Sequence, residues 1–236
     1  MNIQFVDFTK TFLFHSLHEV QHSPDPYPAT KFVPEWYKDL QKVDTESGLP
    51  TVKRCLPFLD AMISGYIIPL PGEITIKIED SENLTINGEG KQLLGIHSFK
   101  QVAGSNWEKD ITVIFRNVWN IITEPGWSCL FVSPLNREQK YPIEIISGIV
   151  DTDNFQQIVN FPAVIKTSST APGTEFTLPK EYPLVQVIPF KRENFTMDIR
   201  KDLTQNDVVK FNKFSNQKEA EPEQYRMFHH EKKNFT

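Results

Sequence analysis

The chain has 236 residues, of which 39% are hydrophobic and 12% aromatic, enough apolar material for one ordinary hydrophobic core. A formal net charge of -5 excludes the basic surface that a phosphate backbone requires, so we expect no nucleic-acid partner. The 18 Phe, 17 Pro and 10 Gly favour a loop-rich β protein over a helical bundle.

The sequence predicts neither a membrane partner nor a disulfide. No apolar run approaches the length of a membrane span, and the start of the chain, Met1 to Asp7, lacks the features of a secretion signal. Cys55 and Cys129 each stand in a short apolar run, which predicts two small buried thiols in a reducing compartment. Because no CxxC pair occurs, a thiolate zinc site is not expected.

Residues 1–50 are predicted to form an N-terminal arm with one short helix. Alternating apolar residues between Ile3 and Phe14 predict one or two strands. His15, His18 and His22 follow at the spacing of one helix face, which could suggest a metal. No acidic ligand is fixed near them, so we interpret them as solvated.

The short helix of the arm is predicted after Pro34. Proline suits a first helical position, and the positive end of the helix dipole favours the acidic side chain of Glu35. Trp36 and Tyr37 then either stack on a ligand or fasten the arm onto the barrel.

Residues 51–195 are predicted to form a β-rich core. A short turn of helix around Leu59 to Met62 leads to a strand at Tyr66 to Leu70. Glu73 to Asp80 alternates apolar and polar residues, and Leu84 to Gly88 follows after a short turn, so the two predict a hairpin with Lys77 and Glu79 in solvent.

The β-branched run from Ile111 to Ile122 is predicted to be a long extended stretch that ends at the turn before Gly126. From Gly126 to Lys191, short apolar runs are separated by Gly, Pro, Asn and Asp, which is typical of short strands joined by tight turns. Residues 196–236 are predicted to be peripheral, with a helix between Leu203 and Phe214.

These patterns predict a mainly β, single-domain fold: a β-barrel or β-clip, or a jelly-roll-like sandwich, with short peripheral helices.

Six motifs in order resemble an uncharacterised protein family carried by tailed bacteriophages of marine bacteria, which is related to a bacterial domain family of unknown function. The motifs are Pro34 to Tyr37, Arg54 to Pro57, Ser64 to Leu70, Pro125 to Phe131, Gly148 to Asp153 and Val185 to Arg192. The resemblance implies a phage-encoded protein found in the cytoplasm of the infected host cell or in the virion. It implies no particular activity.

A more remote resemblance concerns the fold. The stretch from Gly126 to Phe155 is similar in spacing to the middle of the superfamily of dUTPases and dCTP deaminases, a β-clip that usually works as a trimer. The resemblance implies that Asp151 is a catalytic carboxylate that activates a water. In the turn that would bind phosphate the arginine is displaced to Arg137, and the segment from Asn216 to Thr236 contains no glycine with which to cover a triphosphate.

Asp151 and Asp153 could bind a divalent cation or share the work of a base, or they could stabilise a chain reversal as an Asx-turn. Asn136 and Arg137 could bind an anion or cap their turn.

His97 and Gln101 could face a pocket, although a lone histidine is usually just hydrogen-bonded. No metal site is assigned.

We carry three functional hypotheses. The leading one is a non-catalytic β-rich binding or assembly protein, homo-oligomeric or bound to other phage proteins, with no cofactor. The second is a nucleotide-directed enzyme of the dUTPase and dCTP deaminase class that uses Asp151 and Mg²⁺. The third is a metal-dependent small-molecule oxygenase.

Overall fold

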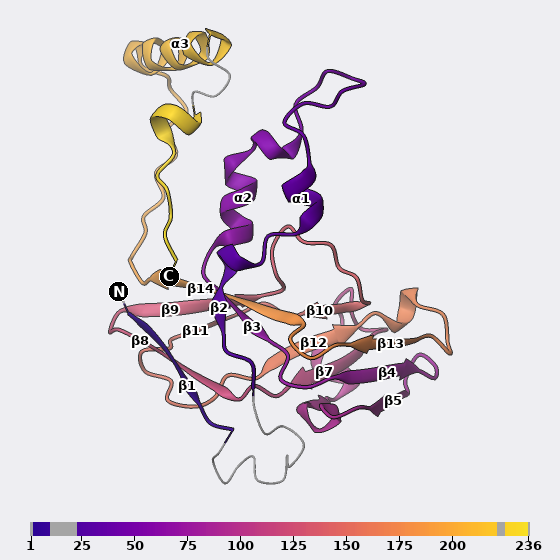
Figure 1. The fold of residues 1–236 in the computed structure, drawn as a ribbon. Helices are drawn as coiled ribbons and strands as arrows, with labels where there is room; N and C mark the ends of the chain where they lie inside the picture. The colour runs from indigo at the N-terminus through magenta and orange to yellow at the C-terminus, as the bar shows by residue number, and fades with distance from the viewer. Residues whose placement is uncertain (1, 10–22, 221–224, 236) are drawn as a thin grey trace. The chain divides into compact units, whose positions relative to one another are not determined.

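The computed structural model describes residues 2–9, 23–220 and 225–235, and most of its regular structure is β-strand (Figure 1). The strands are β1 (Ile3–Asp7), β2 (Tyr27–Pro28), β3 (Tyr66–Pro69), β4 (Ile74–Ile78), β5 (Leu84–Asn87), β6 (Leu94–Ile96), β7 (Ile111–Phe115), β8 (Trp119–Thr123), β9 (Trp127–Val132), β10 (Ile143–Ile145), β11 (Gly148–Val150), β12 (Phe161–Ile165), β13 (Glu175–Leu178) and β14 (Pro183–Lys191).

The helices are fewer and mostly short. They are α1 (Glu35–Asp39), α2 (Leu56–Ile63) and α3 (Gln205–Ala220), with the short helical turns η2 (Ala29–Lys31), η3 (Val52–Arg54), η4 (Lys91–Leu93), η5 (Phe99–Val102), η6 (Thr167–Ser169) and η7 (Tyr225–His229). No helix in the described ranges is long and apolar enough to cross a membrane.

The described strands form four antiparallel sheets, with the orders β11-β9-β14-β3-β2, β10-β12-β7-β6, β13-β4-β5 and β1-β8. The predicted mainly β class with short helices is therefore confirmed. Within the described residues these are open sheets with edge strands, and they do not close into a barrel.

The predicted hairpin is present as β4 and β5, and β13 adds a third strand to it. Ile74, Ile76 and Ile78 on β4 are fully or almost fully buried. Lys77 points the other way and forms an ion pair of 2.7 Å with Glu79, the two side chains being 40% and 37% exposed. The alternation of apolar and polar residues therefore predicted both the strand and its buried face correctly.

The β-branched run from Ile111 to Ile122 is two strands that lie in different sheets. β7 pairs with β12, whereas β8 pairs with β1. The break is fixed by Asn117, whose side chain accepts a hydrogen bond from the backbone N of Trp119 (3.1 Å) and donates one to its carbonyl (2.6 Å). Because these bonds replace ladder bonds, the chain changes sheet there.

The core lies among these sheets and is made of their inward-facing aliphatic and aromatic residues. Phe115 and Phe161 are among its largest fully buried side chains, and the ring of Phe161 lies 5.8 Å from that of Phe131 on β9. Gly65, just before β3, has φ +70, and a Cβ at this position would stand 1.9 Å from the carbonyl oxygen of Val187 on β14. The close approach of β3 and β14 therefore requires glycine at this position.

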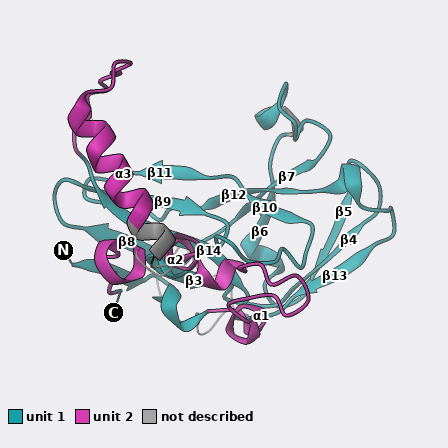
Figure 2. Ribbon diagram, turned by 90° about the horizontal axis from the view of Figure 1, so that it is seen from above, with its two compact units in different colours: residues 1–32, 62–192, 235 teal, residues 33–61, 193–234, 236 magenta. Residues whose placement is uncertain are grey.

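The chain divides into two compact units, coloured separately in Figure 2. One contains residues 1–32, 62–192 and 235, and the other contains residues 33–61, 193–234 and 236. Within the second unit, Tyr37 on α1 is 3% exposed and its ring stacks on Phe58 of α2 at 5.8 Å, while Trp36 is 41% exposed. The rings of the predicted short helix thus contact Phe58 of α2, and Nζ of Lys53 on η3 lies 4.6 Å from the centre of the Tyr37 ring.

The other helices differ in length from their predictions. α2 covers eight residues rather than one turn, because Pro57 lies in its first turn, where a missing N–H costs no hydrogen bond. α3 extends from Gln205 to Ala220, further than the predicted end at Phe214. Its start is fixed by Thr204 and Asp207, which exchange hydrogen bonds of 3.2 and 2.9 Å between side chains and backbone N–H groups.

Cys129 is fully buried as predicted, and burial raises the pKa of its thiol to about 11. The prediction that Cys55 is buried is wrong. Cys55 lies between η3 and α2 and is exposed, because a residue between two short helical turns is not held on the inner face of either. His15, His18 and His22 lie outside the described residues.

Candidate functional site

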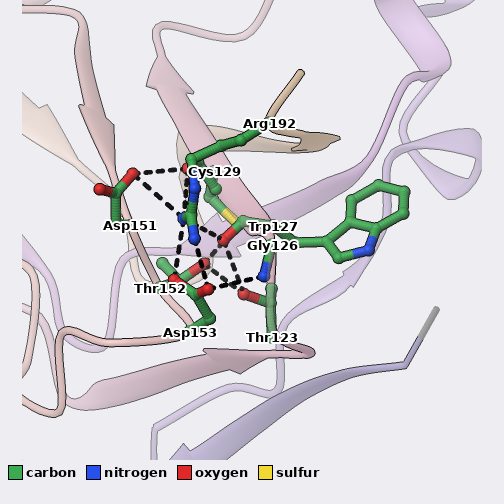
Figure 3. A network of polar contacts seen from close by, with 9 residues as sticks. Thr123, Gly126, Trp127, Cys129, Asp151, Thr152, Asp153 and Arg192 are labelled. Carbon is green, nitrogen blue, oxygen red and sulfur yellow. Dashed lines mark hydrogen bonds and ion pairs between the residues drawn. The ribbon is translucent and has the colours of Figure 1, made fainter. Parts of the chain in front are cut away.

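The candidate site is a polar corner at one end of the five-stranded sheet, where β9, β11 and the end of β14 meet (Figure 3). β9 is antiparallel to both of its neighbours, with Cys129 opposite both Val150 and Pro189. This register brings Asp151 and Asp153, just after β11, to Arg192, just after β14. We call these two aspartates, Arg192, Ser128 and Gly126 the acidic corner.

Asp153 is the buried carboxylate of the acidic corner. Its two oxygens receive a bidentate pair of bonds from Arg192, at 2.8 Å from Nη1 and 2.5 Å from Nη2, and Oδ2 also accepts the backbone N–H of Gly126 at 2.7 Å. Only 5% of its side chain is exposed. The hydrogen bonds from Arg192, with that of the Gly126 amide, lower the pKa of Asp153 from 3.8 to about 2.

Asp151 is the exposed carboxylate of the corner, with 59% of its side chain accessible. Its Oδ1 accepts a hydrogen bond of 2.6 Å from the Ser128 hydroxyl and lies 3.3 Å from Nη1 of Arg192. The turn that follows is closed by the backbone carbonyl of Asp151, which accepts the N–H groups of Asn154 and Phe155 at 3.0 and 2.9 Å. The Asx-turn interpretation is therefore wrong at Asp151.

Behind the carboxylates the corner is lined by buried hydroxyl groups. Thr123 and Thr152 share a hydrogen bond of 2.8 Å, and the Thr152 hydroxyl donates to the sulfur of Cys129 at 3.4 Å. Both threonines are deeply buried, since they are only 6% and 2% exposed. The polar groups of the corner are thus satisfied by one another.

Asn136 and Arg137 are neighbours in the turn after β9, but their side chains lie in different surroundings. Asn136 is exposed and has the left-handed φ of 55, which asparagine tolerates better than most residues. Arg137 turns inward, where Nη2 donates to the carbonyls of Met62 (3.0 Å) and Ala29 (3.4 Å) and the guanidinium carbon lies 4.1 Å from the centre of the Phe32 ring. Arg137 therefore anchors its turn to other backbone segments instead of facing the acidic corner.

The guanidinium of Arg137 is only partly satisfied. Nε and Nη1 are buried and have no hydrogen-bond partner. Burial lowers the pKa of Arg137 to about 10, which still leaves it charged at neutral pH. Among the described residues no carboxylate pairs with it within salt-bridge distance.

His97 and Gln101 lie at β6 and η5, away from the acidic corner. The backbone N–H of His97 donates to the carbonyl of Thr112 on β7 at 2.9 Å, and Gln101 is exposed. Both positions adjoin the four-stranded sheet, whereas the corner belongs to the five-stranded one. The structure thus brings together Asp151 and Asp153 but not the other four predicted residues.

The residue that sequence reasoning missed is Arg192, together with Ser128. The signal available was an arginine immediately after the last apolar strand, since the ends of neighbouring antiparallel strands meet and place such a cation beside acidic turns. In the described part of the chain no three His, Cys, Asp or Glu side chains are grouped so as to hold a metal ion.

The fold and the corner together define a mainly β protein of open antiparallel sheets whose acidic turn is closed by one arginine. No protein-family model matches the chain, and no curated protein is similar to it in sequence.

Several solved structures are similar in outline. The native dUTPase of EIAV is 13% identical, with a TM-score of 0.34 over 61% of this chain and 85% of that one. The dUTPase from phage phi11 of S. aureus is 8% identical, with a TM-score of 0.37 over 87% and 99% of the two chains. That of Staphylococcus bacteriophage 80alpha is also 8% identical, with a TM-score of 0.36 over 86% and 99%. At such scores these similarities carry no argument about activity.

Proposed function

We propose that this chain is a phage-encoded, non-catalytic β-rich protein whose role is binding or assembly. One observation carries this proposal. Both carboxylates of the acidic corner are engaged by partners within the fold, Asp153 by Arg192 and Gly126, and Asp151 by Ser128 and Arg192.

The electrostatics of Asp153 argue against its acting as a general base. A general base works best when its pKa lies near the operating pH, which requires a carboxylate pKa to be raised by burial or by a like charge. Here the pKa of Asp153 is lowered to about 2, the opposite direction. Such a carboxylate holds strands together and abstracts protons poorly.

The resemblance to a phage family supports a location in the infected host cell or in the virion, with copies of the same chain or other phage proteins as partners. A homo-oligomer, a trimer being one form, is the simplest assembly. Light scattering on the purified protein and mass spectrometry of purified particles test these points. A monomer that is absent from particles would remove the assembly role.

A nucleotide-directed enzyme that uses Asp151 is the second candidate, and one observation favours it. With 59% of its side chain exposed and a serine hydroxyl bonded to one oxygen, Asp151 is the corner carboxylate that an external molecule can reach. In that case Mg²⁺ would be expected to accompany the phosphates. The oxygenase hypothesis has no comparable observation in its favour.

The decisive test is turnover of dUTP and dCTP with Mg²⁺, measured for the wild type, for Asp151→Asn and for Glu138→Gln, an exposed carboxylate outside the corner. The binding proposal predicts no turnover above background in all three proteins and no thermal shift with either nucleotide. Turnover that disappears in Asp151→Asn and persists in Glu138→Gln would establish the enzyme instead.

A further inference from the structure

A cavity of about 430 Å³ in the strand-rich unit is lined by no residue of the acidic corner. Three chain segments form it: the turn between β4 and β5, the loop that enters β7, and η6, which follows β12. Its lining residues are Ser81, Glu82, Glu108, Lys109, Asp110 and Ser168. A volume of this size is within the range of small-molecule sites.

The cavity is held in shape by contacts among the three segments. Thr167 on η6 is 6% exposed, and its hydroxyl lies 3.3 Å from the carbonyls of both Ser81 and Lys109. The rim is fixed too, since Asp80 accepts the backbone N–H groups of Glu82 and Asn83 at 2.8 and 2.9 Å. These hydrogen bonds among the lining segments fix the shape of the cavity.

Asp110 is the feature of the cavity that points to a ligand. Its side chain is 3% exposed, and Oδ1 accepts the backbone N–H of Ser168 at 3.0 Å. The closest cation to Oδ2 is Nζ of Lys166 at 4.0 Å, beyond hydrogen-bonding reach, and that ammonium is bound at 2.6 Å by Glu144. Among the described residues Oδ2 accepts no hydrogen bond and has only this long ion pair, so it can accept a donor from a molecule in the cavity.

The charges around Asp110 decide which ligand would supply that donor. The lining contains three carboxylates, Glu82, Glu108 and Asp110, and one ammonium, Lys109, so an anion would be repelled. Within the described ranges the carboxylates are not grouped closely enough to hold a metal ion. A cation that carries its own N–H donors meets both conditions, because it can hydrogen-bond Asp110 and balance the charge of the rim.

We propose that this cavity binds a small organic cation that carries a primary ammonium group. The ammonium donates to Oδ2 of Asp110, Glu82 and Glu108 attract the positive charge at the rim, and the hydroxyls of Ser81 and Ser168 take polar groups elsewhere on the ligand. The site is independent of the acidic corner and of the role proposed above.

The probe is cadaverine, a short diamine, titrated into the isotopically labelled full-length protein and followed by the backbone amide resonance of Ser168. We expect a saturable shift that weakens with added salt, because a cation and a carboxylate attract each other less when screened. The neutral diol analogue of cadaverine should bind at least about tenfold more weakly, since it loses the charge-assisted hydrogen bond.

Variants distinguish the contribution of Asp110 to cadaverine binding from that of the rim carboxylates. Asp110→Asn keeps an oxygen to accept the Ser168 amide and should weaken cadaverine binding at least about tenfold. The double variant Glu82→Gln, Glu108→Gln changes two exposed side chains away from the core and should weaken cadaverine binding several-fold. It tests the proposal even if Asp110→Asn does not fold. Glu138→Gln and Asp151→Asn should bind as the wild type does.

Any of three results overturns the proposal: no shift of the Ser168 resonance of the wild type at millimolar cadaverine, binding of the diol as tight as that of cadaverine, or unchanged affinity of the folded Asp110→Asn variant for cadaverine. A stronger response of the same resonance to Mg²⁺ or Ca²⁺ would likewise replace the organic cation with an inorganic one. None of these outcomes depends on whether the acidic corner is catalytic.

Discussion

Arg192 is the residue at which three strand ends are joined by one side chain. From the end of β14 its guanidinium reaches Asp153 and Asp151, beyond β11, and it also donates to the Trp127 carbonyl and the Ser128 hydroxyl on β9, each at 3.0 Å. Guanidinium groups suit this role because their donors lie in a rigid fork. The corner therefore owes its shape to a residue at the very end of the sheet.

Asp153→Asn tests how much this fork stabilises the protein. Because the folded-state pKa of about 2 lies below the ordinary 3.8, the folded state favours the ionised carboxylate. Its contribution is complete above pH ~4 and is lost as the pH falls through about 2. We expect Asp153→Asn to lower the melting temperature by several degrees at pH 7, and the difference from wild type to shrink between pH ~4 and ~2.

Asp151→Asn is the matched control for that experiment. Asp151 touches the same guanidinium, but most of its side chain is in water, where an ion pair contributes little. Its melting temperature at pH 7 should stay close to that of the wild type. Equal destabilisation of the two variants would show that the bidentate contact of Arg192 with Asp153 contributes no more to stability than its contact with Asp151.

Arg137 presents the opposite situation, a buried cation with two nitrogens, Nε and Nη1, that have no hydrogen-bond partner. Arg137→Ala should lower the free energy of unfolding by about 2–3 kcal/mol, because the packing on Phe32 and the bonds to two carbonyls are lost. Arg137→Met keeps the volume without the charge and should lie within about 1 kcal/mol of the wild type. Urea unfolding of both variants measures these free energies. A methionine variant that is destabilised as much as the alanine variant would contradict the prediction.

At the scale of elements, Gly65 determines whether β3 can lie against β14. Gly48 has the same φ of +70 but nothing within 4 Å of the place that a Cβ would occupy, so it serves as a control for backbone strain alone. We expect Gly48→Ala to cost about 1 kcal/mol. Gly65→Ala must also move the Val187 carbonyl and should cost at least about 3 kcal/mol, measured by urea unfolding. Equal costs would mean that β14 can shift freely.

The sequence predicted elements well where one face of a strand is solvated. β4 was found because Thr75 and Lys77 interrupt its buried isoleucines, whereas the division between β7 and β8 was missed because both strands are buried on both faces. Hydrophobicity alone does not report a change of sheet, which here depends on the side-chain bonds of Asn117. Likewise the corner aspartates were identified, but their partner Arg192 required the register of β9 and β14.

At the scale of the whole molecule, residues far apart in sequence make the sheets. β1 pairs with β8, with Ile3 opposite Thr123, and β14 pairs with β3, with Val187 opposite Tyr66. Local patterns cannot specify such pairings, which explains why the mainly β class was predictable and the strand order was not.

Removal of residues 194–236 tests whether the sheets stand without the C-terminal segment. Every described strand ends by Lys191, so the truncated protein should keep its β-type circular dichroism and a cooperative thermal transition. The loss includes the edge-to-face contact of Phe235 with Tyr66, centroids 6.3 Å apart, and ring pairs contribute about 0.5–1.5 kcal/mol. A melting temperature lowered by more than about 6 °C would show that the segment contributes more than this.

The contrast between the two thiols has a practical consequence. Cys55 is exposed, whereas Cys129 is buried and its pKa is raised to about 11, so that little of it is thiolate at neutral pH. A maleimide dye or spin label should therefore attach at a single position in the unmodified sequence. Spectroscopic reporters can be placed next to α2 without any cysteine being added or removed.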